Sequence, residues 1–242
     1  KGEFEVADLL SNVQDDVHSK LYYEGKDINK WHLCRKRFIE YGTERSPMKW
    51  RRKGFVELFE GSPKLVTMRS PGSIVRTMLD KDNGYFNESA IGFKRWCDLR
   101  GVMNASVSKA YCNLEQRKEF EHNSEIYSYD FLLGIFNSKL ICYELNTNRR
   151  SNIHIYPDDW KRVMLPSINE SNQNLVMELS LFSEQIIQLS EQLQEKRNRF
   201  LHRLSCNFEV LKITGALSAF DQLEFADFLK ELKKQKITLK LS

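Results

Sequence analysis

The sequence lacks the short motifs that mark common catalytic and metal-binding sites. It contains no GxGxxG or GxxxxGK[ST] phosphate loop, no HExxH and no GxSxG. None of its five histidines lies in a recognisable motif. Its cysteines are odd in number and widely spread, with no CxxC pair: Cys34, Cys97, Cys112, Cys142 and Cys206. These absences assign no chemistry to the chain, and the unpatterned cysteines favour a reducing cytoplasm.

Long apolar runs are absent as well. No stretch approaches the ~18 consecutive apolar residues that a membrane-spanning helix needs. The N-terminus has no basic start followed by an apolar segment, so no export signal is predicted. The chain begins at Lys1 without a methionine and ends in the basic stretch LKKQKITLKLS. We therefore expect no membrane attachment and a portion of a longer protein.

Positive charge is concentrated in one stretch. The formal net charge of +4 is mild for 242 residues, and 41% of them are hydrophobic, enough to bury a core. Between Lys30 and Lys53, however, nine basic residues face only Glu40 and Glu44. Such a patch can neutralise DNA phosphates, or it can be a solvated face. The aromatic residues interleaved with it fit a core better than a base-stacking platform; they are Trp31, Phe38, Tyr41 and Trp50.

Up to about Pro166 the pattern is mixed. Short β-branched or aromatic runs alternate with glycine, proline and asparagine turn signals, which predicts a twisted sheet with few helices. The runs are KLYYEG, PKLVTMR, SIVRTMLD and IHIYP. The clearest helix is predicted from Tyr129 to Asn137 or slightly beyond, with Leu140 included in its apolar stripe. The polar residues Asn137 and Ser138 are expected to cap or turn its end.

After Pro166 the composition changes, and glutamine, glutamate, leucine and serine dominate from Asn172 to Cys206. Apolar residues there step alternately by four and three, which predicts a long helix with a heptad seam, roughly 50 Å in length. The seam consists of Leu175, Leu179, Phe182, Ile186, Leu189 and Leu193. A shorter helix is predicted around Phe220 to Lys234. The long helix is expected to require a helical partner, either a second copy or a continuation of the chain.

Four segments, in order, resemble the TaqI-like specificity domain of adenine-specific DNA methyltransferases and single-chain type IIG restriction-modification enzymes. They are YYEGKDINKW, PKLVTMRSPGSIVRTMLDKDNGYFNESAIGF, LLGIFNSKLICYEL and IHIYPDDWKRVMLPSIN. Together they cover most of residues 20–169. The sequence departs from the family pattern at Phe136 and in the Pro-Ser-Ile exit, and residues 101–124 match no part of it. That stretch is a candidate for differences in target specificity.

The resemblance implies a mixed α/β target-recognition domain over residues 1–166 and a truncated helical spacer over residues 167–242. The module would bind double-stranded DNA, while missing methyltransferase or nuclease domains of the same chain carry the chemistry. Those domains would use S-adenosylmethionine and, for cleavage, Mg²⁺; no cofactor is expected in this chain itself. Two alternatives stay open. One is the specificity subunit of a type I restriction system, and the other is a coiled-coil interaction module that does not bind DNA.

Two sets of residues are candidates for DNA contact. The phosphate candidates are Lys30, Arg35, Lys36, Arg37, Lys49, Arg51, Arg52 and Lys53. Arginine can hold guanine, and asparagine adenine, through paired hydrogen bonds in the major groove. The candidates for base readout are Arg69, Arg76, Asn87, Arg95, Arg149, Arg150 and Asn152. Each has a structural alternative: Arg69, for example, could pair with an acidic side chain. No catalytic and no metal-binding residue is predicted.

Overall fold

The computed structural model describes residues 6–46, 56–61, 63–208, 213–235 and 237. The chain divides into two compact units, Lys1–Ile187 and Gln188–Ser242. The boundary between them lies inside the longest helix, whereas the change in sequence composition falls at Pro166. The first turns of that helix therefore belong with the N-terminal unit by packing, even though their sequence has spacer character.

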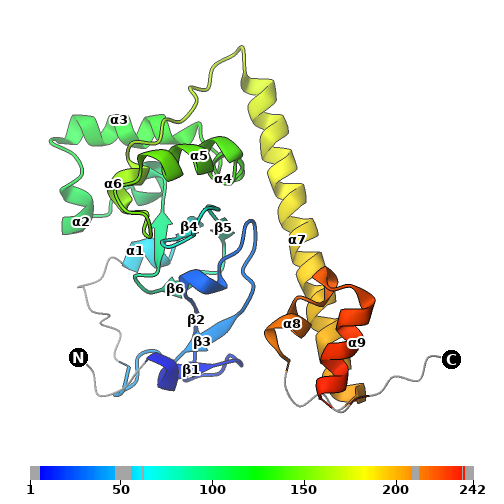
Figure 1. Cartoon of the computed structure of the whole chain (residues 1–242). Helices are drawn as coiled ribbons and strands as arrows, with labels where there is room; N and C mark the ends of the chain where they lie inside the picture. Colours follow the sequence, from blue (N-terminus) through cyan, green and yellow to red (C-terminus); the bar gives the residue numbers. More distant parts are fainter. Residues whose placement is uncertain (1–5, 47–55, 62, 209–212, 236, 238–242) are drawn as a thin grey trace. The chain divides into compact units, whose positions relative to one another are not determined.

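The described residues of the N-terminal unit form two sheets (Figure 1). A four-stranded sheet has the order β1 (Leu10–Ser11), β3 (Arg37–Ile39), β2 (Lys20–Tyr23) and β6 (Tyr85–Phe86). A three-stranded antiparallel sheet has the order β5 (Thr77–Asp80), β4 (Lys64–Met68) and β7 (Ala90–Phe93). Val66 at the centre of β4 is opposite Met78 and Gly92. The central strand β4 is buried along nearly its whole length, including the polar side chains of Lys64 and Thr67.

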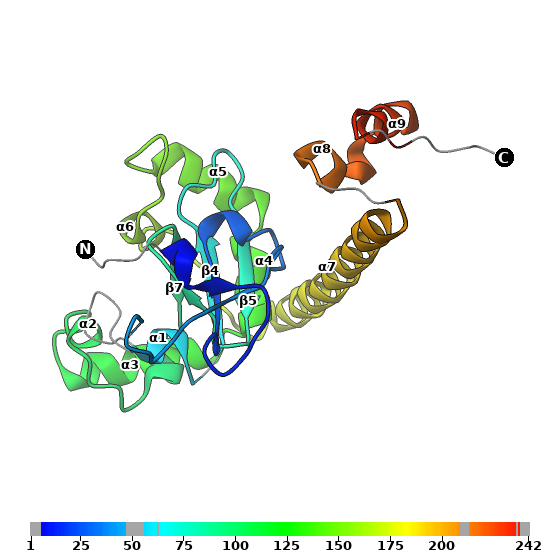
Figure 2. The same ribbon diagram turned by 90° about the horizontal axis from the view of Figure 1, so that it is seen from below.

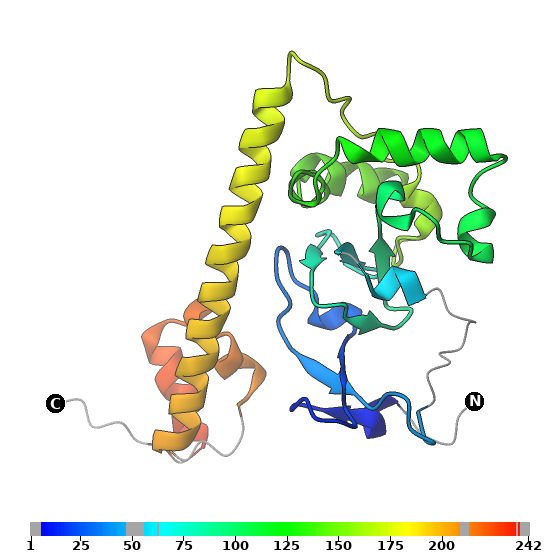
Figure 3. The ribbon, with the colours of Figure 1, turned by 180° about the vertical axis from the view of Figure 1, so that it is seen from behind.

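The N-terminal unit also contains helices. They are α1 (Val56–Phe59), α2 (Ala105–Ser108), α3 (Leu114–Glu125), α4 (Tyr129–Phe136), α5 (Lys139–Asn148) and α6 (Pro157–Trp160). Short 3-10 helices are η1 (Val6–Leu9), η2 (Gly25–Asp27) and η3 (Trp96–Leu99). Figures 1 and 3 show α3 to α6 at one end of the unit and the four-stranded sheet at the other, with the three-stranded sheet between them.

Helix α4 packs beside β5, as the view from below shows (Figure 2). Its apolar stripe, including Phe131, Leu133 and Phe136, is buried in one cluster with Leu65 of β4 and Trp160 of α6. This confirms the predicted helix and its sheet-facing role. The end of the helix is also as predicted, because Asn137 is its C-cap and Ser138 starts α5 by accepting a hydrogen bond from the Ile141 amide at 3.2 Å.

Several sequence predictions are wrong. There are two sheets rather than one, and helices are numerous among the described residues before Pro166. The IHIYP run is not a strand, and Ile155 joins the sheet region through one backbone hydrogen bond, from its amide to the Arg69 carbonyl at 2.8 Å. Residues 101–124 form α2 and most of α3. Leu140 lies on α5 and is 71% exposed, because the new helix starting at Ser138 turns it away from the core.

The predicted long helix is confirmed as α7 (Gln173–Phe208). Its first part packs on the N-terminal core through Val176, Leu179 and Ile187. Gly134 of α4 permits this approach, because a Cβ atom there would lie 2.6 Å from Ser183 Oγ. In the C-terminal unit, Leu204 of α7 is buried with Leu217 and Leu232. The elements that complete that unit are α8 (Gly215–Ser218), η4 (Phe220–Gln222) and α9 (Phe225–Lys234).

The carboxylate of Glu60 joins the strands of the four-stranded sheet, and it makes stability sensitive to acid. It accepts hydrogen bonds from Lys20 Nζ at 2.7 Å and Tyr85 Oη at 2.6 Å, and these bonds hold its pKa below the ordinary 4.5. As pH falls below about 4.5, Glu60 takes up a proton more readily in the unfolded chain than in the folded one. The unit should therefore lose stability as pH falls from about 4.5 through the lower pKa that Glu60 has in the folded state.

Urea unfolding followed by tryptophan fluorescence between about pH 3 and 6 measures this dependence. The variant Glu60→Gln should flatten part of the acid slope. Glu57→Gln, which removes an exposed carboxylate from α1, the short helix just before Glu60, is the matched control and should leave the slope unchanged. Identical slopes for the wild type and Glu60→Gln would contradict the assignment.

Candidate nucleic-acid interface

Two loops lie together at one end of the β4–β5 hairpin. The hairpin loop runs from residue 69 to 76, and the second segment, 149–156, joins α5 to α6. Ser73 O accepts a hydrogen bond from Asn146 Nδ2 at 2.8 Å, and Ser70 Oγ lies 2.6 Å from His154 Nδ1. Five of the seven residues predicted to read bases lie on these two loops. We call them the loop-end cluster: Arg69, Arg76, Arg149, Arg150 and Asn152.

Within the cluster, Arg69 is the most firmly placed side chain. Its guanidinium carbon lies 4.9 Å from the centroid of the Tyr156 ring. Its Nη1 donates to the Glu88 carbonyl at 3.3 Å. The acidic partner considered from the sequence is not found, because Arg69 makes no ion pair among the described residues.

The other cluster residues are held more loosely. Arg149 Nη1 donates to the Gly72 carbonyl at 3.1 Å, which ties the second loop to the hairpin loop. Arg150 is exposed, with Nη1 3.9 Å from Asp158 Oδ2, a separation at which an exposed ion pair contributes little. Arg76 is half-buried with Nη1 4.0 Å from Met68 Sδ, and Asn152 is exposed. The cluster thus presents positive charge and hydrogen-bond donors at the surface.

Two predicted readout residues have structural roles instead. Arg95 precedes η3, donates twice to Asp98 at 2.9 and 3.1 Å, and donates to the Tyr127 carbonyl at 3.0 Å. The hydrogen bonds that Arg95 donates to Asp98 also raise the pKa of Arg95. Asn87 caps a turn, because its Oδ1 accepts from the Ser89 amide at 3.0 Å. Neither side chain retains the free hydrogen-bonding edge that base readout needs.

The described residues of the predicted phosphate patch do not form one surface. Arg37 is buried and forms ion pairs with Asp27 and Glu24, so its assignment to phosphate is wrong. Lys30 is half-buried and donates through Nζ to the Asn137 carbonyl at 2.9 Å, which also makes it structural. Arg35 and Lys36 are exposed. The remaining four candidates lie outside the described residues: Lys49, Arg51, Arg52 and Lys53.

Lys36 is also distant from the loop-end cluster along the hairpin. Its Nζ is 3.5 Å from Asp82, which follows β5 at the end opposite to the 69–76 loop.

Of the aromatic residues interleaved with the patch, Trp31 and Tyr41 pack against core clusters, as predicted. Trp50 lies outside the described residues. The described part of this basic stretch, up to residue 46, is therefore divided among core, surface and turn roles.

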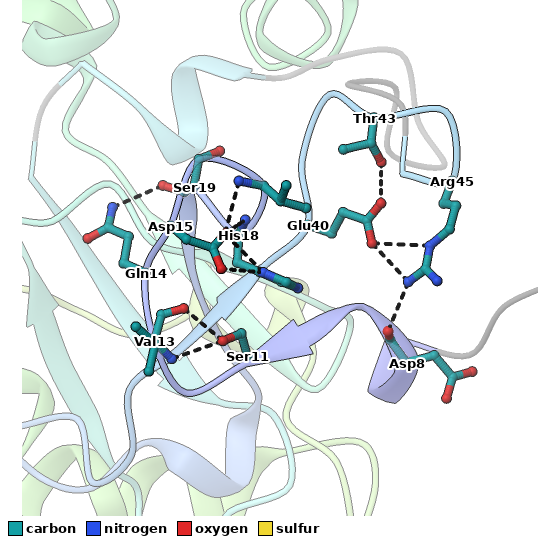
Figure 4. Close-up of polar contacts among 11 residues, drawn as sticks. Asp8, Ser11, Val13, Gln14, Asp15, His18, Ser19, Glu40, Thr43 and Arg45 are labelled. Carbon is teal, nitrogen blue, oxygen red and sulfur yellow. Dashed lines mark hydrogen bonds and ion pairs between the residues drawn. The ribbon is translucent and has the colours of Figure 1, made fainter.

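A second polar group lies on the loops next to β1 and β3 (Figure 4). Asp15 Oδ1 accepts from the Val17 and His18 amides at 2.9 and 2.6 Å and lies 3.1 Å from His18 Nδ1. Those hydrogen bonds lower the pKa of Asp15. Glu40 accepts from Arg45 and thereby closes the following turn. These contacts shape the loops, and they occupy Arg45, another member of the basic stretch.

Sequence reasoning missed Tyr156 and His154, which pack against the hairpin loop. Both lie in the run that was predicted to be a strand. A signal was present, because Pro157 is followed by Asp159, the pattern of a helix N-terminus. In the structure Asp159 Oδ2 accepts from the Tyr156 amide at 2.8 Å, and Asp159 Oδ1 accepts from the Arg150 amide at 3.4 Å. The buried carboxylate of Asp159 thus holds both ends of the loop that carries Arg149 and Arg150.

Neither a metal site nor a membrane span is found in the described part of the chain. No group of three or more histidine, cysteine, aspartate or glutamate side chains there could hold a metal ion. No helix among those residues is both long and apolar enough to cross a bilayer.

Comparison with known proteins bears on the C-terminal part of the chain. No curated protein matches this chain. The family described as "Domain of unknown function (DUF8810)" matches residues 170–242, the segment that contains α7, α8 and α9.

Proposed function

We propose that the chain up to about residue 166 is a sequence-specific recognition module for duplex DNA in a restriction-modification enzyme. It would position a separate adenine methyltransferase domain, with or without an endonuclease, on the target site. The observation that carries this proposal is the loop-end cluster, with four arginines and one asparagine on two hydrogen-bonded loops. The family resemblance of residues 20–169 supports the same function.

The rigidity of the cluster's support suits base recognition. Loops that read DNA need side chains placed to within hydrogen-bonding tolerance, and rigid elements beneath them supply that precision. Here the hairpin loop continues directly from β4 into β5, while Ile155, fully buried, anchors the second loop in the core. Arginine and asparagine are the side chains that read guanine and adenine through paired contacts in the major groove.

The chemistry would belong to other domains. By the resemblance, S-adenosylmethionine would supply the methyl group and Mg²⁺ would serve an attached nuclease. This chain has no glycine-rich cofactor motif and no NPPY-type tetrapeptide, so those groups would bind elsewhere in the longer protein. The role of the present residues is to bind and orient the duplex while the missing domain flips the adenine. A cytoplasmic location is part of this proposal.

The salt dependence of binding tests the proposal. If Arg76, Arg149 and Arg150 each neutralise one phosphate, affinity for nonspecific duplex should fall about 40-fold between about 50 and 200 mM salt, with a logarithmic slope near −2.7. Fluorescence anisotropy with a labelled duplex measures this slope on the whole chain. The double variant Arg149→Gln/Arg150→Gln should reduce its magnitude by about 2.

A matched control removes two exposed lysines from the region of α2 and α3, which lies away from the two loops. The variant Lys109→Gln/Lys118→Gln changes net charge by the same amount and should leave the slope almost unchanged. A flat salt dependence in the wild type, or equal effects of the two double variants, would count against the interface.

Helix α7 supports an additional role as a spacer that pairs with another helix. The seam predicted from the sequence remains largely uncovered by the described residues, with Leu175 67%, Leu189 63% and Leu193 52% exposed. Apolar side chains repeated at heptad spacing are typical of coiled-coil partners. Self-association that is insensitive to salt, without any affinity for DNA, would favour the coiled-coil interaction module over the recognition module.

A further inference from the structure

The guanidinium of Arg69 is fixed by neutral groups rather than by an acid. The backbone at Arg69 is held on both sides, because its amide donates to Ser89 O at 2.9 Å and its carbonyl accepts from the Ile155 amide at 2.8 Å. The guanidinium lies over the Tyr156 ring and donates once, to the Glu88 carbonyl. An arginine held this way keeps its full charge and most of its in-plane donors for a ligand.

The stacking ring is itself immobilised. Tyr156 directly follows Ile155, which is 0% exposed within the core cluster. Its amide is bound by Asp159 Oδ2 at 2.8 Å, and Pro157 begins α6 immediately after it. The position of the ring therefore depends on two rigid elements, the core and the α6 terminus. A side chain fixed before binding loses less conformational entropy when it meets a ligand.

Burial also limits how Arg69 can bind. Its Nε atom is buried and has no hydrogen-bond partner among the described residues, so the edge formed by Nε and one terminal nitrogen is closed to a ligand. The end formed by the two terminal nitrogens remains, because each of them carries two N–H donors and only one donor of Nη1 is used, by the Glu88 carbonyl. That pair matches two acceptors in one plane, such as O6 and N7 of guanine in the major groove. Arg37 and Arg95 lack this property because carboxylates occupy their donors.

We propose that Arg69, stacked on Tyr156, is the specificity-determining residue that selects a guanine in the recognised sequence, with Tyr156 as its positioning residue. This inference rests on the proposed DNA-recognition function. Arginine makes the paired end-on contact to guanine through both terminal nitrogens, while the Tyr156 ring holds the plane of the guanidinium. A phosphate would accept the same donors, so the test must separate base selection from charge.

Selection from a pool of randomised duplexes, using the whole chain, makes this separation. The wild type should enrich guanine at one position. Arg69→Lys keeps the charge but loses the planar fork, so it should retain nonspecific affinity and salt slope while guanine preference at that position falls by about 10-fold. Tyr156→Phe keeps the stacking ring and should behave like the wild type. Tyr156→Leu removes the ring and should weaken the preference several-fold.

The outcomes distinguish this inference from the proposed function. If the wild type binds no duplex, the function itself fails. If it binds with the expected salt slope but Arg69→Lys leaves the selected sequences unchanged, the function stands and Arg69 does not select a base. If Arg69→Lys weakens every duplex equally, with a wild-type unfolding midpoint, the contact is to phosphate and the inference is overturned. Loss of preference in Tyr156→Leu but not in Tyr156→Phe would support the positioning role.

Discussion

Replacing Asp80 with alanine is expected to lower the free energy of unfolding of the N-terminal unit by about 3–5 kcal/mol. Lys64 Nζ lies 2.7 Å from Asp80 Oδ2, with the two side chains 0% and 2% exposed. The same carboxylate oxygen accepts from Tyr23 Oη at 2.6 Å and from the Gly84 amide at 2.9 Å. Without it, the Lys64 ammonium stays buried with the Phe59 carbonyl at 2.9 Å. Burial disfavours the charged form of Lys64 and lowers its pKa, whereas Asp80 favours the charged form. Removing Asp80 therefore leaves a buried ammonium without its main stabilising partner.

Urea unfolding followed by tryptophan fluorescence measures this loss, because all four tryptophans precede residue 187. Lys64→Met should be less damaging than Asp80→Ala. The thioether side chain fills similar space, and Asp80 keeps its bonds from Tyr23 and Gly84. Asp82→Ala, which breaks an ion pair whose two side chains are 63% exposed, should cost less than about 0.5 kcal/mol. Similar losses for Asp80→Ala and Asp82→Ala would show that the Lys64 site is not a buried pair.

The elements that could be predicted from the sequence are those set by local periodicity. Strands β2 and β4, helix α4 and the long helix α7 all carry their apolar pattern within one continuous segment. The IHIYP run has the composition of a strand, but Ile155 is buried in a core cluster with side chains of α4, α5 and α6, and Pro157 begins α6. Tertiary contacts therefore override its propensity. The division into two sheets was also not predictable, because strand pairing is set by contacts far apart in the chain.

The same distinction explains the candidate site. The positions of Arg69 and Arg149 at loops could be predicted from flanking turn residues, but their convergence depends on the Arg149 bond to Gly72, 77 residues away. Arg37 and Arg95 could have been discounted. Arg37 lies on the same face of β3 as the buried Ile39, and Arg95 lies three residues before Asp98. Residue type alone therefore overestimates the number of arginines available to DNA.

Replacing Asn137 with alanine should cost about 2–4 kcal/mol, although this residue looks like a simple helix terminator in the sequence. It is 5% exposed. Its Oδ1 accepts from the Thr77 amide at 3.0 Å, and its Nδ2 donates to the Thr77 carbonyl at 2.9 Å. Strand β5 lies at the edge of its sheet, where the Trp31 amide also donates to the Thr77 carbonyl at 3.0 Å. The Asn137 side chain supplies the acceptor for the Thr77 amide and a second donor for the Thr77 carbonyl. Thr77 is fully buried, so water cannot replace these bonds without opening the structure.

The neighbouring cap supplies the control, since Ser138→Ala removes one hydrogen bond to the Ile141 amide and should cost only about 1 kcal/mol. Amide hydrogen exchange gives a local readout: the Thr77 amide should exchange faster in Asn137→Ala than in Ser138→Ala, even after correction for global stability. Unchanged protection of Thr77 would contradict the role of Asn137.

Because Thr77 directly follows Arg76, loss of the hydrogen bonds between Asn137 and Thr77 should also weaken DNA binding through the loop-end cluster. Ser138→Ala should not, since it leaves the base of the hairpin loop intact.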